Sequence, residues 1–243
     1  MAKTVFMRHA ILSLFAILCV QFVVAQDATT VVSSAPVKEF LSSFTAINVD
    51  APIKLQLIKI GEHDAPYIVY DTKGNETSKF TFEVDRKNSI LKISERTDYK
   101  RETITEVTVY FNRLTDISIS KADVTVEGII ESKLLDIYTS NDAHLIAEID
   151  VLDLMLFAAG KSRIMLSGTA HYHTADVSAA EYDAGRLNTT STIAEASHNA
   201  VMKVDASERL ELKTATGGKI YYVTHPVILR SEVTLFGGEI SKI

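Results

Sequence analysis

Two histidines in the second half of the chain stand two residues apart, the spacing that puts both side chains on one face of a strand. They are His171 and His173, and His144 lies about one coil of the repeat described below earlier in the chain. Imidazole is a common metal ligand, so these three side chains could form a metal site. No cysteine and no matching pair of carboxylates accompanies them. The ordinary alternative, solvated histidines on an outer strand, is therefore our prediction.

Acidic residues recur just before or within short apolar segments of the chain: Asp116, Asp136, Asp153, Asp176 and Glu211. Stacked on successive coils, such carboxylates could form a ladder that binds calcium. Their spacings of 20, 17, 23 and 35 residues drift, however, and stacked like charges repel. A glycoside hydrolase would need two carboxylates facing each other across a groove. Asp136, Asp153 and Glu181 are available for that role, but their spacing does not select them, and we expect a solvated acidic face.

Two glycine pairs, Gly217-Gly218 and Gly237-Gly238, have the composition of a phosphate-binding loop. Neither pair opens a helix, and neither has the Lys-Ser/Thr ending of such a loop. The Gly-x-Ser-x-Gly turn of serine hydrolases is absent from the sequence as well. We therefore predict no catalytic, cofactor-binding or metal-binding residues, no cofactor, and a protein that is not an enzyme.

The elements that must position these residues follow one short pattern, an apolar alternating segment, a small or polar turn, and a second alternating segment. The first residues of the turns are separated by 20, 19, 21, 17, 19 and 20 residues. A period near twenty residues indicates a solenoid or an array. The expected turns are Ser120–Asp123, Ser140–Ala143, Ala159–Ser162, Ala180–Asp183, Ser197–Ala200, Thr216–Lys219 and Phe236–Glu239.

The segments between the turns each present two apolar residues to one face, as in Leu154-Met155-Leu156 and Ile164-Met165-Leu166. Period-two alternation predicts half-buried strands, and no single coil could bury its apolar face alone. We predict an all-β fold, a right-handed, single-stranded β-helix-like solenoid of about seven coils over residues 114–243. Helix is nearly excluded, because the best candidate, Ser191–Ala200, lacks three-and-four spacing of apolar residues.

Residues 44–113 also alternate, in longer strands that include Phe44–Ile60 and a hairpin around Asp85–Ser89. We expect them to form an N-terminal antiparallel β cap, in one continuous domain with residues 114–243. Residues 26–43 are rich in Ser, Thr, Ala and Val without a sustained period, and this composition predicts a linker.

The first 25 residues have the pattern of a secretory signal peptide. Lys3 and Arg8 supply positive charge, Ala10–Val20 is almost wholly apolar, and cleavage is expected before Gln26. A lipid-modified Cys19 is disfavoured because Leu18, not a small residue, precedes it. The apolar run is too short for a membrane anchor, and no transmembrane span is expected after cleavage. We predict export to the periplasm, the outer-membrane surface or the extracellular space.

Composition limits the partners. Without the first 25 residues the chain has 23 basic and 31 acidic residues, a formal charge of −8, and no cysteine. Nucleic acid and anionic lipid both require a basic surface, so we expect neither as a partner. Disulfides and cysteine-ligated metals are excluded. Tryptophan is absent, which excludes a carbohydrate site built on stacked tryptophans, although tyrosine could replace them.

Three features together resemble a known family: the Phe44–Val49 and Ile53–Leu57 strands, the Asn88–Ile93 hairpin exit, and the small-residue turns about twenty residues apart. The chain is similar from Val37 to Ile243 to the head GIN domain family, described as auto-transporter adhesins and common in exported proteins of Bacteroidetes. The family's Ser-Gly-Ser-Gly turns are replaced here by sequences such as Ala159-Gly160-Lys161-Ser162. The resemblance implies a β-helix-like stack, export and an adhesin role, and it carries no active residues.

Three functions are consistent with these observations. The first is a non-catalytic, adhesin-like binding module that presents polar ladders, for example Thr189–Thr192, to a glycan or to an envelope or host protein. The second is a structural or accessory protein of the periplasm or outer membrane. The third is a polysaccharide-active enzyme on a β-helix scaffold, which we rank last.

Overall fold

The computed structural model describes residues 35–74, 79–96, 103–234 and 236–243. The chain divides into Met1–Val31 and Val32–Ile243, and the expected signal peptide lies outside the described residues. No described segment is α-helical, and no described helix could span a membrane. The strands are β1 (Val37–Phe40), β2 (Ala46–Asp50), β3 (Lys54–Lys59), β4 (Tyr67–Asp71), β5 (Phe80–Asp85), β6 (Ile90–Glu95), β7 (Glu106–Phe111), β8 (Asp116–Ser120), β9 (Asp123–Ser140), β10 (His144–Ala159), β11 (Arg163–Ser178), β12 (Glu181–Ser197), β13 (Val201–Val204), β14 (Arg209–Thr214), β15 (Gly218–Tyr222), β16 (Ile228–Val233) and β17 (Gly238–Lys242).

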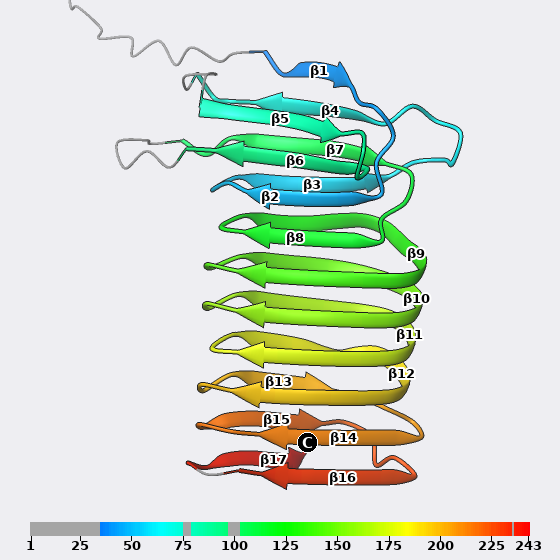
Figure 1. Ribbon diagram of the computed structural model, residues 1–243, viewed down its shortest axis with the longest axis vertical. Helices are drawn as coiled ribbons and strands as arrows, with labels where there is room; N and C mark the ends of the chain where they lie inside the picture. The colour runs from blue at the N-terminus through cyan, green and yellow to red at the C-terminus, as the bar shows by residue number, and fades with distance from the viewer. Residues whose placement is uncertain (1–34, 75–78, 97–102, 235) are drawn as a thin grey trace, which may run out of the picture. The chain divides into compact units, whose positions relative to one another are not determined.

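The described residues from position 35 onward form a β-solenoid of about seven coils, which confirms the fold class expected from the repeat. The long strands β9 to β12 bend halfway, so each coil has two arms, and successive coils pair in parallel (Figure 1). The hydrogen-bonded sheet is continuous, and its two halves are named here sheet 1 and sheet 2. Sheet 1 contains β3, β7, the first halves of β9–β12, β13, β15 and β17, and sheet 2 contains β2, β6, β8, the second halves of β9–β12, β14 and β16.

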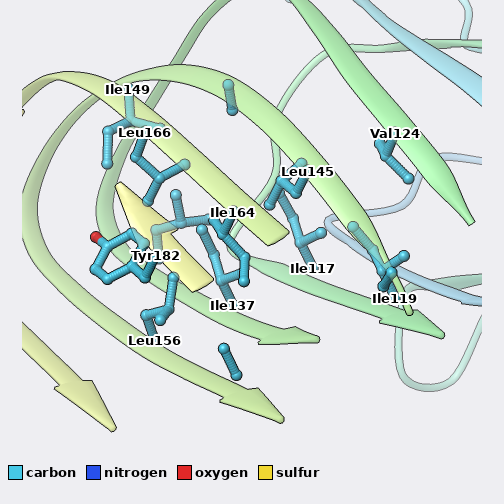
Figure 2. Packing of buried hydrophobic residues seen from close by; sticks show 14 of the residues in the cluster. Ile117, Ile119, Val124, Ile137, Leu145, Ile149, Leu156, Ile164, Leu166 and Tyr182 are labelled. Atoms are coloured by element: carbon cyan, nitrogen blue, oxygen red, sulfur yellow. The ribbon is translucent and has the colours of Figure 1, made fainter. Parts of the chain in front are cut away.

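The core lies between the two sheets and consists of apolar side chains stacked coil on coil (Figure 2). In sheet 1, Leu145 pairs with Ile164, which in turn pairs with Tyr182, so one interior position is filled in three successive coils. Leu154 is fully buried and Ile164 is 3% exposed, while Met155 between Leu154 and Leu156 faces out. The alternation in the sequence therefore assigned the inside and outside of these segments correctly.

Each of the seven chain reversals predicted from the sequence contains a residue in the left-handed backbone region. Such a residue lets the chain reverse from sheet 2 to sheet 1 within two or three residues. The predicted position of one of these reversals was wrong by one or two residues. The turn expected at Ala180–Asp183 lies at Ala179 and Ala180, and Glu181 already begins β12. The residues with positive φ at the seven turns are Lys121, Asn141 and Asp142, Gly160 and Lys161, Ala179, His198 and Asn199, Thr216 and Gly217, and Phe236 and Gly237.

The N-terminal region does not follow the order of the chain. β2 pairs in parallel with both β6 and β8, and β3 pairs in parallel with both β7 and β9. The coil made by β2 and β3 therefore lies between the coil of β6–β7 and that of β8–β9, as Figure 1 shows. Parallel stacking thus extends through much of residues 44–113. Among the described residues, antiparallel pairing is confined to three strand pairs, β1 with β4, β4 with β7 and β5 with β6.

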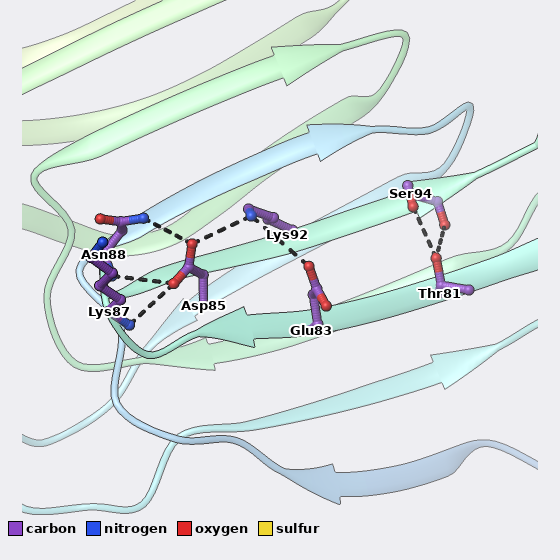
Figure 3. A network of polar contacts seen from close by, with 7 residues as sticks. All are labelled: Thr81, Glu83, Asp85, Lys87, Asn88, Lys92 and Ser94. Carbon is purple, nitrogen blue, oxygen red and sulfur yellow. Dashed lines mark hydrogen bonds and ion pairs between the residues drawn. The ribbon is translucent and has the colours of Figure 1, made fainter.

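Two local features bear on the expected boundaries. Val37–Phe40, within the expected linker, forms β1 and pairs with Tyr67–Tyr70 of β4, so this part of the linker is ordered as a strand. The hairpin expected around Asp85–Ser89 joins β5 to β6. Asp85 accepts hydrogen bonds from the backbone N–H groups of Lys87 and Asn88 and from the Asn88 amide, which closes the turn (Figure 3).

Candidate binding surfaces

The three candidate histidines do not form a site. Strand β11 bends between its two halves, and the alternation of buried and exposed residues shifts there, so His171 is exposed whereas His173 is 2% exposed. The expectation of two solvated histidines on one outer face was wrong for His173, because strict period-two alternation does not continue through a bend. His144 lies on sheet 1, with its Nδ1 2.8 Å from Asp123 Oδ1. In the described part of the chain, no three His, Cys, Asp or Glu side chains are grouped to hold a metal.

His173 instead belongs to a polar chain inside the core. Its Nε2 lies 3.0 Å from Tyr182 Oη, and its Nδ1 lies 3.3 Å from Thr192 Oγ1. Thr192 contacts Thr189 Oγ1 at 2.7 Å, and the Thr189 hydroxyl donates to the Asp205 carbonyl at 2.6 Å. Burial lowers the pKa of His173 to about 4 and raises the pKa of Tyr182, so both side chains are neutral at neutral pH.

That interior chain changes the expectation for Thr189–Thr192. Thr189 is 7% exposed and Thr192 is fully buried, so two of the four hydroxyls serve the core and cannot reach a ligand. Thr190 lies outside and its Oγ1 is 3.0 Å from His171 Nδ1. A continuous ladder of four hydroxyls on the surface is therefore not formed, because the bend of β12 falls within this segment.

The candidate carboxylates separate into two groups. Asp116 and Asp136 are cross-strand partners in sheet 2, and Asp153 lies nearby on the next coil. Burial, followed by the charges of Asp116 and Asp153, raises the pKa of Asp136. Asp176 pairs with Phe157 and Glu195, and Glu211 pairs with Ile193 and Arg230, so neither continues the ladder. A calcium ladder through all five residues is therefore not formed.

The carboxylates considered for glycoside hydrolysis do not face each other. Asp136 and Asp153 lie on sheet 2, while Glu181 begins the sheet 1 half of β12, where Arg163 Nε lies 3.5 Å from its Oε2. The outer column that contains Glu181 carries mostly charges of both signs, Glu106, Lys54, Asp123, His144, Arg163, Glu181, Val201, Lys219 and Glu239 in spatial order. Its contacts are those of a solvated face in which neighbouring charges offset one another.

Sheet 2 carries the most extensive exposed apolar surface in the middle of the solenoid. Tyr138 and Phe157 are cross-strand partners whose rings stack with centroids 5.3 Å apart and an interplanar angle of 6°. Their neighbours on the same outer side are aliphatic or aromatic and 39–59% exposed. We call this surface the apolar face: Leu134, Tyr138, Met155, Phe157, Tyr172 and Ile193.

Carboxylates are interspersed in the apolar face. Asp136 lies between Leu134 and Tyr138 on β9, Asp153 precedes Met155 on β10, and Asp176 is the cross-strand partner of Phe157. No described residue forms an ion pair with Asp136, Asp153 or Asp176. Sheet 1 exposes a smaller apolar set, Ile146 and Met165 beside its charged column and Val201 within it.

Sequence reasoning missed the apolar face because its members occupy the outward positions of alternating segments. Tyr138 and Phe157 stand 19 residues apart and Leu134 and Tyr172 stand 38 apart, which are one and two repeats. Aligning the coils by their buried residues and then reading the outward columns would have brought these residues together. The signal was therefore present in the sequence, in the residues between the core positions.

Comparison with known proteins identifies the family. The family model described as "Putative auto-transporter adhesin, head GIN domain" matches residues 43–226. The chain belongs to this family. Among solved structures, a protein from Bacteroides fragilis NCTC 9343 described as "a putative adhesin" has a TM-score of 0.75 and 18% identity, with 86% of this chain and 96% of that chain covered. This head GIN protein therefore has the expected fold.

Two other solved structures also resemble this head GIN protein over 86% of its length. A protein from Parabacteroides merdae ATCC 43184 described as "a putative adhesin" has 13% identity and a TM-score of 0.66, with 95% of that chain covered. A protein from Parabacteroides distasonis ATCC 8503, titled "Putative lipid binding protein", has 16% identity and a TM-score of 0.64 over 96% of its chain. At these identities the likeness concerns the fold alone. None of the curated proteins matches the chain.

Proposed function

We propose that this head GIN protein is an exported, non-catalytic, adhesin-like binding module of the cell envelope. The family description supports a binding role over a catalytic one. Export is supported by the signal-peptide pattern of residues 1–25. The observation that carries the proposal is the apolar face, because exposed aromatic and aliphatic side chains gathered on one side of a sheet commonly mark an interaction site.

The composition of the apolar face favours a protein partner over a glycan. Tyrosine, phenylalanine and methionine are enriched in protein interfaces, and Leu134 and Ile193 add aliphatic surface. Tyr138 and Phe157 cover one face of each other, so they do not form a flat aromatic platform for a sugar ring. The unpaired carboxylates of Asp136, Asp153 and Asp176 complement a basic rim on the partner.

The binding test measures how strongly the natural chain and two variants bind to the envelope fraction of the native host and to host-cell surfaces. The variant Phe157→Ser removes half of the stacked pair, while Ile146→Ser removes an exposed apolar side chain from sheet 1 as the matched control. We expect Phe157→Ser to weaken binding by roughly tenfold or more. The Ile146→Ser control should bind like the natural chain. Added salt should weaken the binding of the natural chain and of this control.

The class of partner is tested with the same surfaces after treatment. Trypsin digestion of the surface should abolish binding, whereas periodate oxidation of its glycans should leave binding intact. The opposite result would assign the face to a glycan. Equal binding by Phe157→Ser and the natural chain would place the binding site elsewhere and refute the proposal.

The compartment is tested by protease accessibility on intact cells of the native host, with an epitope tag after Ile243 and lysed cells as the control. Digestion on intact cells would support a surface adhesin. Protection until lysis would favour the second function, a periplasmic structural or accessory protein. A polysaccharide-active enzyme has the least support, because Glu181 lies on the other sheet from Asp136 and Asp153.

A further inference from the structure

The last coil of the described stack, made by β16 and β17, has a strand neighbour on one side only. β16 pairs with β14, and β17 pairs with β15. The other end of the stack is covered by antiparallel strands, whereas β16 contains no proline or bulge that would discourage pairing. Side chains around this coil are exposed and apolar: Val227, Ile228, Val233, Phe236 and Ile243.

The sequence of β16, Ile-Leu-Arg-Ser-Glu-Val, is complementary to its own reverse about Ser231. In an antiparallel pair centred on Ser231, Arg230 lies opposite Glu232 of the partner subunit. By the same symmetry, Glu232 lies opposite Arg230 of the partner subunit. Leu229 and Val233 form two apolar cross-strand pairs in the same way. Opposite charges and apolar residues in directly opposed positions stabilise an antiparallel pair.

The side chains of β16 have the directions that this pairing needs. Arg230 and Glu232 align with Glu211 and Lys213 of β14, on the outer side of sheet 2. Leu229 and Val233 align with Leu210 and Thr214, which point into the core. The charged pairs would therefore form outside, and the apolar pairs would continue the core from one subunit into the next.

We propose that this coil is a dimer interface, at which β16 pairs antiparallel with β16 of a second copy about a twofold axis through Ser231. An axis normal to the two sheets maps each sheet onto its own continuation, so β17 meets β17 of the partner subunit in the same operation. Such a contact is self-complementary and closes after two subunits. The proposal is independent of the apolar face and of the protein's adhesin role.

Charge reversal across the symmetry axis tests the pairing. In a dimer of the Arg230→Glu variant, a carboxylate at position 230 faces the carboxylate at position 232 of the partner subunit, and symmetry repeats this contact. In a dimer of the Glu232→Arg variant, two cations face each other at the same two contacts. Each single variant should raise the dimer dissociation constant roughly thirtyfold. The double variant Arg230→Glu/Glu232→Arg should restore the natural value. An equimolar mixture of the two single variants should form heterodimers, because each strand then faces opposite charges.

The measurement is sedimentation equilibrium of the full mature chain over a roughly hundredfold range of concentration, because mass action makes dimerisation concentration-dependent. Arg230 also contacts Glu211, with Nη1 3.0 Å from Oε1, so the thermal unfolding of each variant confirms that it is folded. Lys213→Glu is the matched control, because it reverses a charge on β14, one coil away from the edge strand β16. Its dimer dissociation constant should equal that of the natural chain.

The expected pattern is specific to β16 paired with itself. A natural chain that stays monomeric throughout would overturn the proposal and leave the edge to a different partner. A dimer that both single variants form with natural affinity would place the interface on another surface. Failure of the mixed single variants to associate, with the double variant dimeric, would exclude the symmetric antiparallel register.

Discussion

Acid should destabilise this protein through one buried side chain, His173. It is 2% exposed, and both of its side-chain partners, Tyr182 and Thr192, are neutral hydroxyls. No carboxylate among its hydrogen-bond partners compensates a positive imidazolium, and burial lowers its pKa from 6.5 to about 4. Protonation in the folded state is therefore unfavourable until the pH approaches 4.

The sign and size of the effect follow from proton linkage. Between pH 6.5 and pH 4 the unfolded chain holds a proton on this histidine and the folded chain does not, so the free energy of unfolding falls as the pH falls. The difference between the two pKa values, multiplied by 1.36 kcal/mol for each pKa unit, gives a total loss of about 3 kcal/mol. The full stability is present above pH 6.5, and the loss is complete below pH 4.

The assay is urea unfolding of the natural chain and of His173→Gln at several pH values from 7.5 to 4.5. The carboxylates titrate in both chains, so their contribution cancels in the difference. His173→Gln should be less stable at pH 7.5 because it fits the interior less well, and this gap should narrow by about 2.5 kcal/mol at pH 4.5.

The matched control is His171→Gln, which changes an exposed histidine of the same bend and keeps His173. That variant should show the full pH dependence of the natural chain. A gap between the natural chain and His173→Gln that stays constant from pH 7.5 to 4.5 would refute the reasoning, because it would mean that the folded protein accepts the proton as readily as the unfolded chain.

Three further predictions concern the core, the turns and the acidic residues. Leu154→Asp should abolish soluble folding, since it buries an unpaired carboxylate, whereas the neighbouring variant Met155→Asp should fold. Equal circular dichroism and equal solubility of the two variants would contradict the assignment of Leu154 to the interior and Met155 to the exterior. Gly218→Ala should lower the free energy of unfolding by about 3 kcal/mol, because its Cβ would lie 2.2 Å from the Ala196 carbonyl oxygen. Gly237→Ala, with φ +78° and no heavy atom within 4 Å of the new Cβ, should cost only about 1 kcal/mol in the same urea titration, and equal costs would argue against this packing. Asp136→Asn should raise stability at pH 7 by roughly 0.5 kcal/mol, and the gain should vanish in acid, where Asp136 is protonated; a loss at pH 7 would mean that the carboxylate has a stabilising partner.

The coils were predictable because two local signals agree in each of them. Alternation as in Leu154-Met155-Leu156 fixes which side chains are buried, and residues able to adopt positive φ, such as Asn141 and Gly160, mark the reversals. The turn at Ala179 was misplaced by a residue or two because alanine carries no turn signal of its own. The family resemblance agreed with this fold and was confirmed by the match over residues 43–226.

What the sequence did not reveal depends on pairing between distant segments. Nothing local in β2 indicates that it lies between β6 and β8, because parallel strands with similar apolar alternation are interchangeable until the whole stack is assembled. The bend of β11 likewise separates His171 from His173, although the two residues have the spacing of neighbours on one face. The candidate sites failed where a bend or a register shift intervened.

The two proposed surfaces, although independent, would act together. A twofold axis normal to the sheets leaves both apolar faces on the same side of the dimer. Phe157 and Phe157 of the partner subunit would then be separated along the stack by nine strand spacings, about 43 Å. A partner displayed densely on a surface could engage both faces, and bivalence strengthens attachment without any new contact. Arg230→Glu should therefore weaken attachment to a dense surface while leaving the affinity for a single soluble partner unchanged, and equal loss in both formats would show that the edge itself contacts the partner.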